Sequence, residues 1–169
     1  MLNACMGIGH GLYVFSVFVH VIAACMWIGG MLFLILAFIP GIKNHPDKVS
    51  LIAEVSMKYR RLGAMALVLL AVTGWLQLEY RGVQWSVGYF TGTAFGKTAG
   101  LKILVFACIV AISLVHDYYL GTRAIETWKN QPDHPKTTKL RSLSRMMGRF
   151  SFAFALLAAW LGIILARGW

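Results

Sequence analysis

Residues 11–38 have the sequence GLYVFSVFVHVIAACMWIGGMLFLILAF, which contains no Asp, Glu, Lys or Arg. A helix needs about 20 apolar residues to cross the hydrocarbon layer of a membrane, and this stretch exceeds that length. Its apolar residues are continuous rather than alternating, which favours a helix over a strand of a membrane barrel. Residues 11–38 therefore predict a first transmembrane helix.

Three further stretches of this kind lie near 55–78, 99–120 and 146–166. The chain has 169 residues, of which 59% are hydrophobic and only 13% are charged, and its mean hydropathy is +0.69. A soluble domain carries roughly a quarter charged residues, so we expect a lipid bilayer around this chain. We predict a single all-α membrane domain over 1–169, polytopic and folded as an antiparallel four-transmembrane-helix bundle.

The basic residues are distributed unevenly between the connecting segments, although the formal net charge is +10. Twelve of the sixteen lie in or beside the segments 39–54 and 121–145: Lys43, Lys48, Lys58, Arg60, Arg61, Arg123, Lys129, Lys136, Lys139, Arg141, Arg145 and Arg149. Cytoplasmic loops carry such an excess, which predicts an inner-membrane protein with both termini on the outer side and no nucleic-acid partner. The remaining connection, 79–98, is predicted to be an outer loop whose aromatic residues favour a short surface helix.

Two histidines lie inside predicted spans, His20 in the first and His116 in the third. Ionisable groups in lipid are costly and suggest function. At helical spacing His20 shares a face with Trp27, and His116 shares one with Lys102 and Arg123. Two interpretations stay open: each imidazole bonds a neighbouring helix, or these five residues bind a haem or a metal ion, with basic groups for the haem propionates.

Depth separates the two histidines. If the first and third spans centre near Cys25 and Val110, His20 lies about 7 Å outward and His116 about 9 Å inward along the helices. The resulting gap of about 16 Å compares with about 4 Å between two axial nitrogens on one iron. One haem that joins both histidines is therefore disfavoured, whereas a haem at one histidine with a different second ligand is open.

Copper is the competing metal. Cys5, Met6 and His10 cluster at the outer end of the first helix, and soft sulfur ligands suit Cu(I). Met also fills apolar space, so a packing interpretation of these side chains is open as well.

The stretch HVIAACMWIGGMLF, with His20, Trp27 and a following Gly pair, resembles the first helix of copper resistance protein D (CopD)-type membrane domains. The similarity continues with Arg60-Arg61, Thr73-Gly74, Lys102 and Arg145, and so extends over most of the chain. The motif is also similar to HemJ-type protoporphyrinogen oxidases, four-helix proteins thought to hold a b-type haem. That resemblance matches His20, Lys102 and His116 to residues of the family.

The HemJ-type pattern has an Arg soon after the Trp motif, whereas 33–40 is wholly apolar here. We therefore favour a CopD-like inner-membrane protein that holds a b-type haem or a copper ion, in redox or metal homeostasis. The alternatives are a HemJ-like oxidase and a small cofactor-free subunit of a larger membrane complex. Whether the protein is an enzyme, and whether it joins a redox complex or a second copy of itself, stays open.

Overall fold

The computed structural model describes residues 2–130 and 134–168, with side chains from Gly9 onward. The helices are α1 (Leu2–Phe33), η1 (Leu34–Phe38), α2 (Ile39–Gly41), α3 (Lys48–Tyr80), α4 (Val87–Gly92), α5 (Ala94–Leu114), η2 (Val115–Leu120), α6 (Gly121–Asn130) and α7 (Pro135–Arg167). Because η1 and η2 are short π-helical segments, α1–η1–α2 and α5–η2–α6 each form one continuous rod. The described residues contain no strand, which confirms the all-α prediction.

Four helices are long and apolar enough to cross a membrane. In the most apolar part of each, only 17–22% of the residues are buried by the rest of the chain. The apolar side chains therefore face mainly outward, where lipid rather than water can cover them. The chain is a multi-pass membrane protein.

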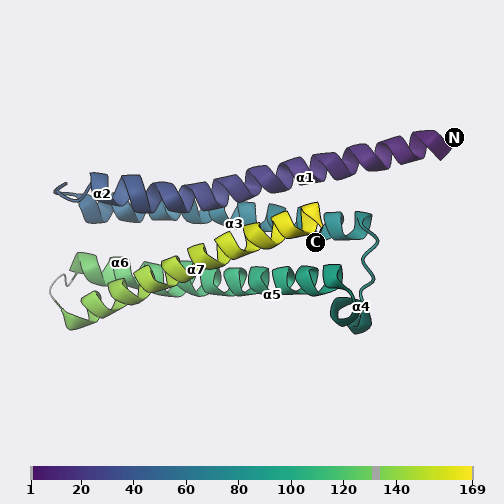
Figure 1. Cartoon of the computed structure of the whole chain (residues 1–169). Helices are drawn as coiled ribbons and strands as arrows, with labels where there is room; N and C mark the ends of the chain where they lie inside the picture. Colours follow the sequence, from purple (N-terminus) through teal and green to yellow (C-terminus); the bar gives the residue numbers. More distant parts are fainter. Residues whose placement is uncertain (1, 131–133, 169) are drawn as a thin grey trace.

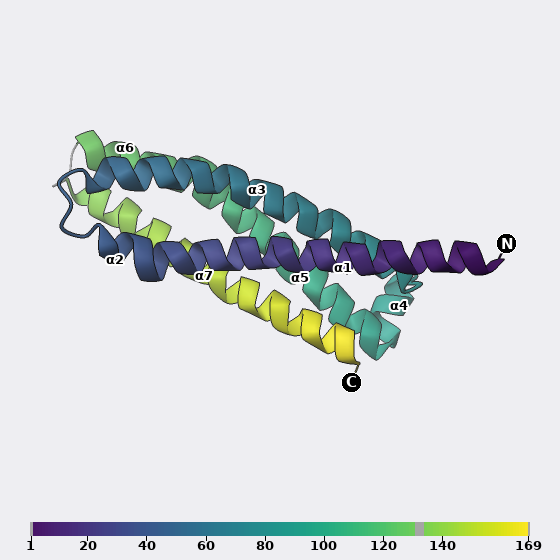
Figure 2. The same ribbon diagram turned by 90° about the horizontal axis from the view of Figure 1, so that it is seen from above.

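The helices form two antiparallel hairpins, α1 with α3 and α5–η2–α6 with α7 (Figure 1). Both described chain ends lie at the same end of the bundle as α4, which we call the terminal end. The turns after α2 and α6 lie at the opposite end, the hairpin end (Figures 1 and 2). This arrangement matches the predicted alternation of the spans across the membrane.

The helices continue into the segments 39–54 and 121–145, which were expected to be connecting loops. Between α2 and α3 only 42–47 is non-helical, and α6 and the first turns of α7 occupy most of the second segment. The polar composition of these segments did not predict helices, because the contacts that stabilise them are not between apolar side chains. The Arg141 guanidinium lies 3.5 Å from the ring centre of Trp128, and the Thr137 hydroxyl donates to the Thr127 carbonyl. Such contacts hold α6 and α7 together.

The segment 79–98 contains the expected short helix, α4. The Ser86 hydroxyl accepts a hydrogen bond from the Tyr89 backbone N–H at its start. Thr93 caps α5 in the same way by accepting from the Gly96 N–H at 2.9 Å. These two N-caps satisfy donors that a helix start leaves unpaired. The chain therefore reverses direction between α3 and α5 with defined geometry.

The core is small and lies along the middle of the bundle. It consists of Trp27, Ala66, Val105, Ile109, Ala155 and Leu161, and so draws on all four long helices. Alanine and glycine at the contacts let the helices approach closely, the usual solution in membranes. This packing fixes the rotation of each helix and, with it, the direction of the polar side chains.

Candidate functional site

The His20–Gly30 motif is the face of α1 that packs on α3. A Cβ built at Gly74 of α3 would lie 3.4 Å from Cε1 of His20, and one built at Gly63 would lie 3.6 Å from the Trp27 ring. A Cβ at Gly30 would overlap the Tyr59 ring. His20, Trp27 and Tyr59 therefore each lie against a glycine of the opposite helix.

His20 is oriented by a hydrogen bond from its helix to the next. Its Nδ1 lies 2.8 Å from Oγ1 of Thr73, and that hydroxyl also contacts the carbonyl oxygen of Leu69 at 2.5 Å. A hydroxyl has one proton, and a carbonyl can only accept. Thr73 therefore donates to Leu69, and Nδ1 of His20 must carry the proton that it donates to Thr73.

The tautomer follows from this chain of hydrogen bonds. With Nδ1 protonated, Nε2 of neutral His20 has a free lone pair. No side chain in the described part of the protein forms a hydrogen bond to Nε2. An imidazole that donates through one nitrogen and leaves the other free is the arrangement found at metal-ligating histidines.

Lys102 lies toward the terminal end of the bundle, as does His20. It projects from α5 toward α7, where a Cβ at Gly162 would lie 3.1 Å from its Nζ. Two of the predicted cofactor-binding residues thus lie in the same half of the bundle. Trp27, the third on this side, is buried in the core, and its contacts are those of packing.

His116 lies in a second, separate cluster. Its Nδ1 is 2.8 Å from Oδ1 of Asp117, and its Nε2 is 3.1 Å from Oγ of Ser144 on α7. Both ring nitrogens therefore have partners within the protein. The residue lies in the π-helical segment η2, where the N–H of Gly121 reaches back to the His116 carbonyl. Such segments are frequent at functional sites, but here Nδ1 bonds the neighbouring Asp117 and Nε2 joins η2 to α7.

The distance between the clusters can be measured along α3. Thr73 contacts His20, whereas Arg60 lies over the ring of Tyr118, two residues after His116. Thirteen residues separate Arg60 from Thr73, which is about 20 Å of helix. The two histidines therefore cannot ligate one metal ion, in agreement with the depth argument from the sequence.

Arg123 is not joined to His116, although their spacing placed both on one face. Its Nη1 donates to Oη of Tyr119 at 2.8 Å, and the guanidinium lies 4.2 Å from the centre of that ring. The wider turn of η2 changes the angular relation between residues before and after it. Arg123 consequently lines an open hollow at the hairpin end, next to Glu126.

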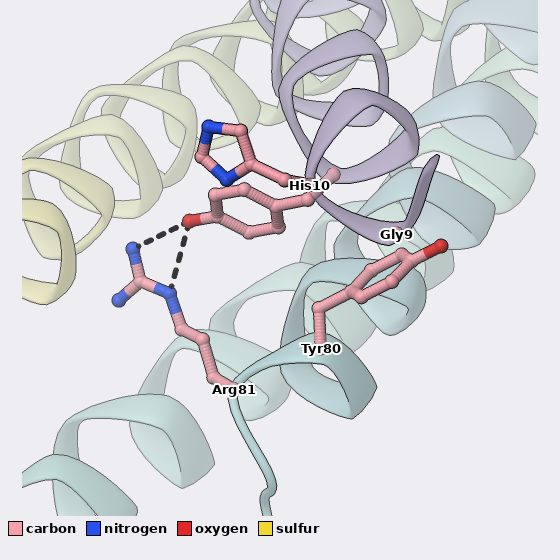
Figure 3. A pocket seen from close by; sticks show the side chains of 5 residues that line it. Gly9, His10, Tyr80 and Arg81 are labelled. Atoms are coloured by element: carbon pink, nitrogen blue, oxygen red, sulfur yellow. Dashed lines mark hydrogen bonds between the residues drawn. The ribbon is translucent and has the colours of Figure 1, made fainter. Parts of the chain in front are cut away.

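The predicted copper cluster is only partly covered by the structure. Cys5 and Met6 lie outside the residues whose side chains are described. His10 lines a hollow of about 410 Å³ at the terminal end, with Tyr80 and Arg81 (Figure 3). Among the described residues, no three His, Cys, Asp or Glu side chains converge as a metal site would require.

Sequence reasoning had not assigned Thr73, Gln77 or Arg81 to a site. They recur at intervals of four, Thr73 and Gln77 in α3 and Arg81 at its C-cap, so they lie on one face, and this spacing of polar groups at the end of an apolar span was the available signal. Arg81 joins several helices: it donates to Oη of Tyr13 on α1, and Nη1 donates to the carbonyl oxygen of Leu165 on α7.

Comparison with known proteins shows similarity to one of unassigned role. An uncharacterized protein of Aquifex aeolicus (strain VF5) is 29% identical over 154 residues, which cover 90% of this chain and 94% of that protein. No family model matches the chain. No solved structure matches it either.

Proposed function

We propose that this chain is a CopD-like inner-membrane protein that binds a b-type haem through Nε2 of His20 and serves in redox or metal homeostasis. The observation that carries the proposal is the hydrogen bond from Nδ1 of His20 to Thr73. It leaves Nε2 with a free lone pair, on a side chain held by the bundle. When bound, a haem would supply one-electron redox chemistry.

The ligand set favours haem over copper. A porphyrin supplies four nitrogens to its iron, so one imidazole from the protein, that of His20, would suffice to hold it. A copper ion needs several protein ligands, preferably with sulfur, and among the described residues His20 is not part of any group of three or more His, Cys, Asp or Glu side chains. A copper site that includes Cys5, Met6 and His10 would be a different site from that of His20.

The protein's own residues would orient and shield the cofactor. Thr73 holds the imidazole in one tautomer and one rotation. Gly74 packs against the ring, where a Cβ would lie in van der Waals contact with Cε1 at 3.4 Å. Trp27 and the core below it keep water from the inner half of the bundle. These contacts are those of a ligand held by its surroundings.

The orientation in the membrane follows from charge. The basic residues concentrate toward the hairpin end, which we place in the cytoplasm by the positive-inside rule. Both termini, α4 and the His20 cluster then belong to the outer half of the bundle. A redox partner would meet the cofactor from the periplasmic side.

Two alternatives keep the same fold. A HemJ-like protoporphyrinogen oxidase would also use His20 and Lys102, and their position in the same half of the bundle suits that enzyme equally. A cofactor-free accessory subunit would use the outward apolar faces of the helices against a larger complex instead of lipid. A visible spectrum separates this last alternative from the other two.

The test is the absorption spectrum of the full chain purified in detergent. We expect a Soret band, with α and β bands on reduction, which is lost in His20→Gly and restored by added imidazole. Rescue by imidazole distinguishes a ligand from a packing residue, because free imidazole can bind iron without rejoining the helices. Thr73→Val, of the same shape, should weaken binding, and Ser16→Ala is the matched control. A colourless wild-type protein after haem addition would refute the proposal.

A further inference from the structure

Lys102 is a cation inside the bundle with no counter-ion. It is half-buried, and no described acidic side chain forms an ion pair with it. The acidic residue nearest the terminal end, Glu79, instead accepts from the indole N–H groups of Trp75 and Trp85. Charged side chains within a membrane are almost always paired. Lys102 therefore lacks the counter-ion that a charged side chain within a membrane normally has.

Snorkelling to the membrane surface does not explain Lys102. Its Nζ lies beside Gly162, five residues before α7 ends at Arg167. That position is about 7 Å below the helix end, and the ammonium is directed between α5 and α7. The side chain thus places its charge inside the protein.

Gln77 supplies a second unpaired donor. Its Nε2 is buried and has no hydrogen-bond partner among the described residues. Buried polar groups are nearly always satisfied, and an exception calls for an explanation such as a missing ion or ligand. On α3, Gln77 lies one turn from Thr73, which contacts His20, and one turn from Arg81, which contacts Tyr13.

Lys102 on α5 lies at the depth of the segment between Thr73 and Arg81. Arg81 lies 5.6 Å from the ring centre of Phe95, and Lys102 follows Phe95 by seven residues, or two turns. Helix side chains lean toward the N-terminus, so Lys102 extends back toward the level of Gln77. Its Nζ lies beside Gly162, and Leu165, whose carbonyl oxygen accepts from Arg81, is three residues farther along α7. Lys102 and Gln77 therefore occupy the same layer of the bundle.

We infer that this layer binds a carboxylate, which accepts from the ammonium of Lys102 and the amide of Gln77. A carboxylate carries one negative charge, which one lysine neutralises. The Arg81 guanidinium donates to Tyr13 and Leu165 instead, so one ammonium and one amide remain for the anion, and the two oxygens of a carboxylate can accept from both. The carboxylate could come from the porphyrin itself, in which case the inference rests on the proposed function, or from a free acid such as a fatty acid.

The experiment has two arms, both on the full chain purified without cofactor. The first compares binding of protohaem with that of its dimethyl ester, whose carboxylates are blocked. If the porphyrin supplies the carboxylate, wild type should prefer protohaem by about tenfold, as expected for a charge-assisted hydrogen bond. The preference should vanish in Lys102→Met and persist in Lys102→Arg.

The second arm compares hexanoate with neutral hexanamide as stabilisers against heat. If a free acid is the ligand, only hexanoate should raise the melting temperature of the wild type, and Lys102→Met should not respond. Equal binding of both porphyrins, with no effect of hexanoate, would overturn the carboxylate site and leave the haem proposal standing. No porphyrin binding, together with Lys102-dependent stabilisation by hexanoate, would overturn the haem proposal instead.

A single substitution tests the placement of the two donors. Gln77→Glu puts a carboxylate into the same layer, where it should pair with Lys102. We expect a higher melting temperature than wild type and loss of carboxylate preference in both arms. In the Lys102→Met background the same substitution should lower the melting temperature, because it then buries an unpaired charge. A melting temperature lowered equally in both backgrounds would contradict the shared layer.

Discussion

Gly30 faces the most crowded contact between α1 and α3, and Gly30→Ala should destabilise the protein. A Cβ at this position would overlap Cε2 of Tyr59 and lie 3.0 Å from Cζ and Oη of the same ring. Unstrained carbon atoms in contact are about 3.5–4.0 Å apart. The ring also donates from Oη to the carbonyl oxygen of Trp27 at 2.6 Å. An alanine therefore forces either the helices apart or the tyrosine away from its acceptor.

The expected change in the free energy of unfolding combines a loss from overcrowding with a gain in helix propensity. Overpacking of a well-filled contact costs about 1–3 kcal/mol, and loss of the Tyr59 hydrogen bond would cost about 1 kcal/mol, so we take about 2 kcal/mol for the site. Replacing a helical glycine by alanine gains up to about 1 kcal/mol. Gly29→Ala is the matched control, since no atom lies within 4 Å of a Cβ built there. The two variants should differ by about 2 kcal/mol.

The assay is unfolding in mixed detergent and SDS micelles, followed by circular dichroism. Gly29→Ala should be at least as stable as wild type, and Gly30→Ala less stable. In a Tyr59→Ala background the Gly30→Ala effect should disappear, because the obstructing ring is gone. Equal stabilities of the two glycine variants, or a Gly30→Ala cost unchanged by Tyr59→Ala, would refute the packing argument.

Three further predictions concern the ends of the bundle. Arg81→Ala should lower stability by about 2 kcal/mol, because charged hydrogen bonds to two helices are lost, and Arg81→Lys should recover only part of it in the same unfolding assay. His116→Gln should keep full cofactor occupancy in the visible spectrum and lose less stability than His116→Ala, because an amide can still bond Ser144; loss of the Soret band would instead make it a ligand. Cysteine labelling in intact cells should reach Gln84→Cys from outside and Asn130→Cys only after permeabilisation, and the reverse pattern would invert the orientation.

The helical fold could be predicted from the sequence because each transmembrane helix is marked by the hydropathy of its own residues. Residues 11–38 predicted the first span from composition alone, and α1 covers them together with η1. The ends were less predictable: the polar residues of α6 resemble a loop until Trp128 is seen to stack on Arg141. Helix length beyond the apolar region depends on such contacts, which composition does not encode.

The same distinction between predictable composition and unpredictable contacts holds for the candidate site. Hydropathy and charge were enough to predict that the chain crosses a membrane as helices, that its basic residues gather at one end, and that His20, Lys102 and His116 lie within apolar spans. The hydrogen bond of His20 to Thr73 and that of Ser144 to His116 became visible in the folded bundle alone. These partners are 53 and 28 residues apart in the chain. The partition of a residue between water and lipid is largely its own property, but its partner depends on how two helices are rotated and shifted against each other. Small residues such as Gly63 and Gly74 set that rotation through close packing, and packing exists only once the helices have met.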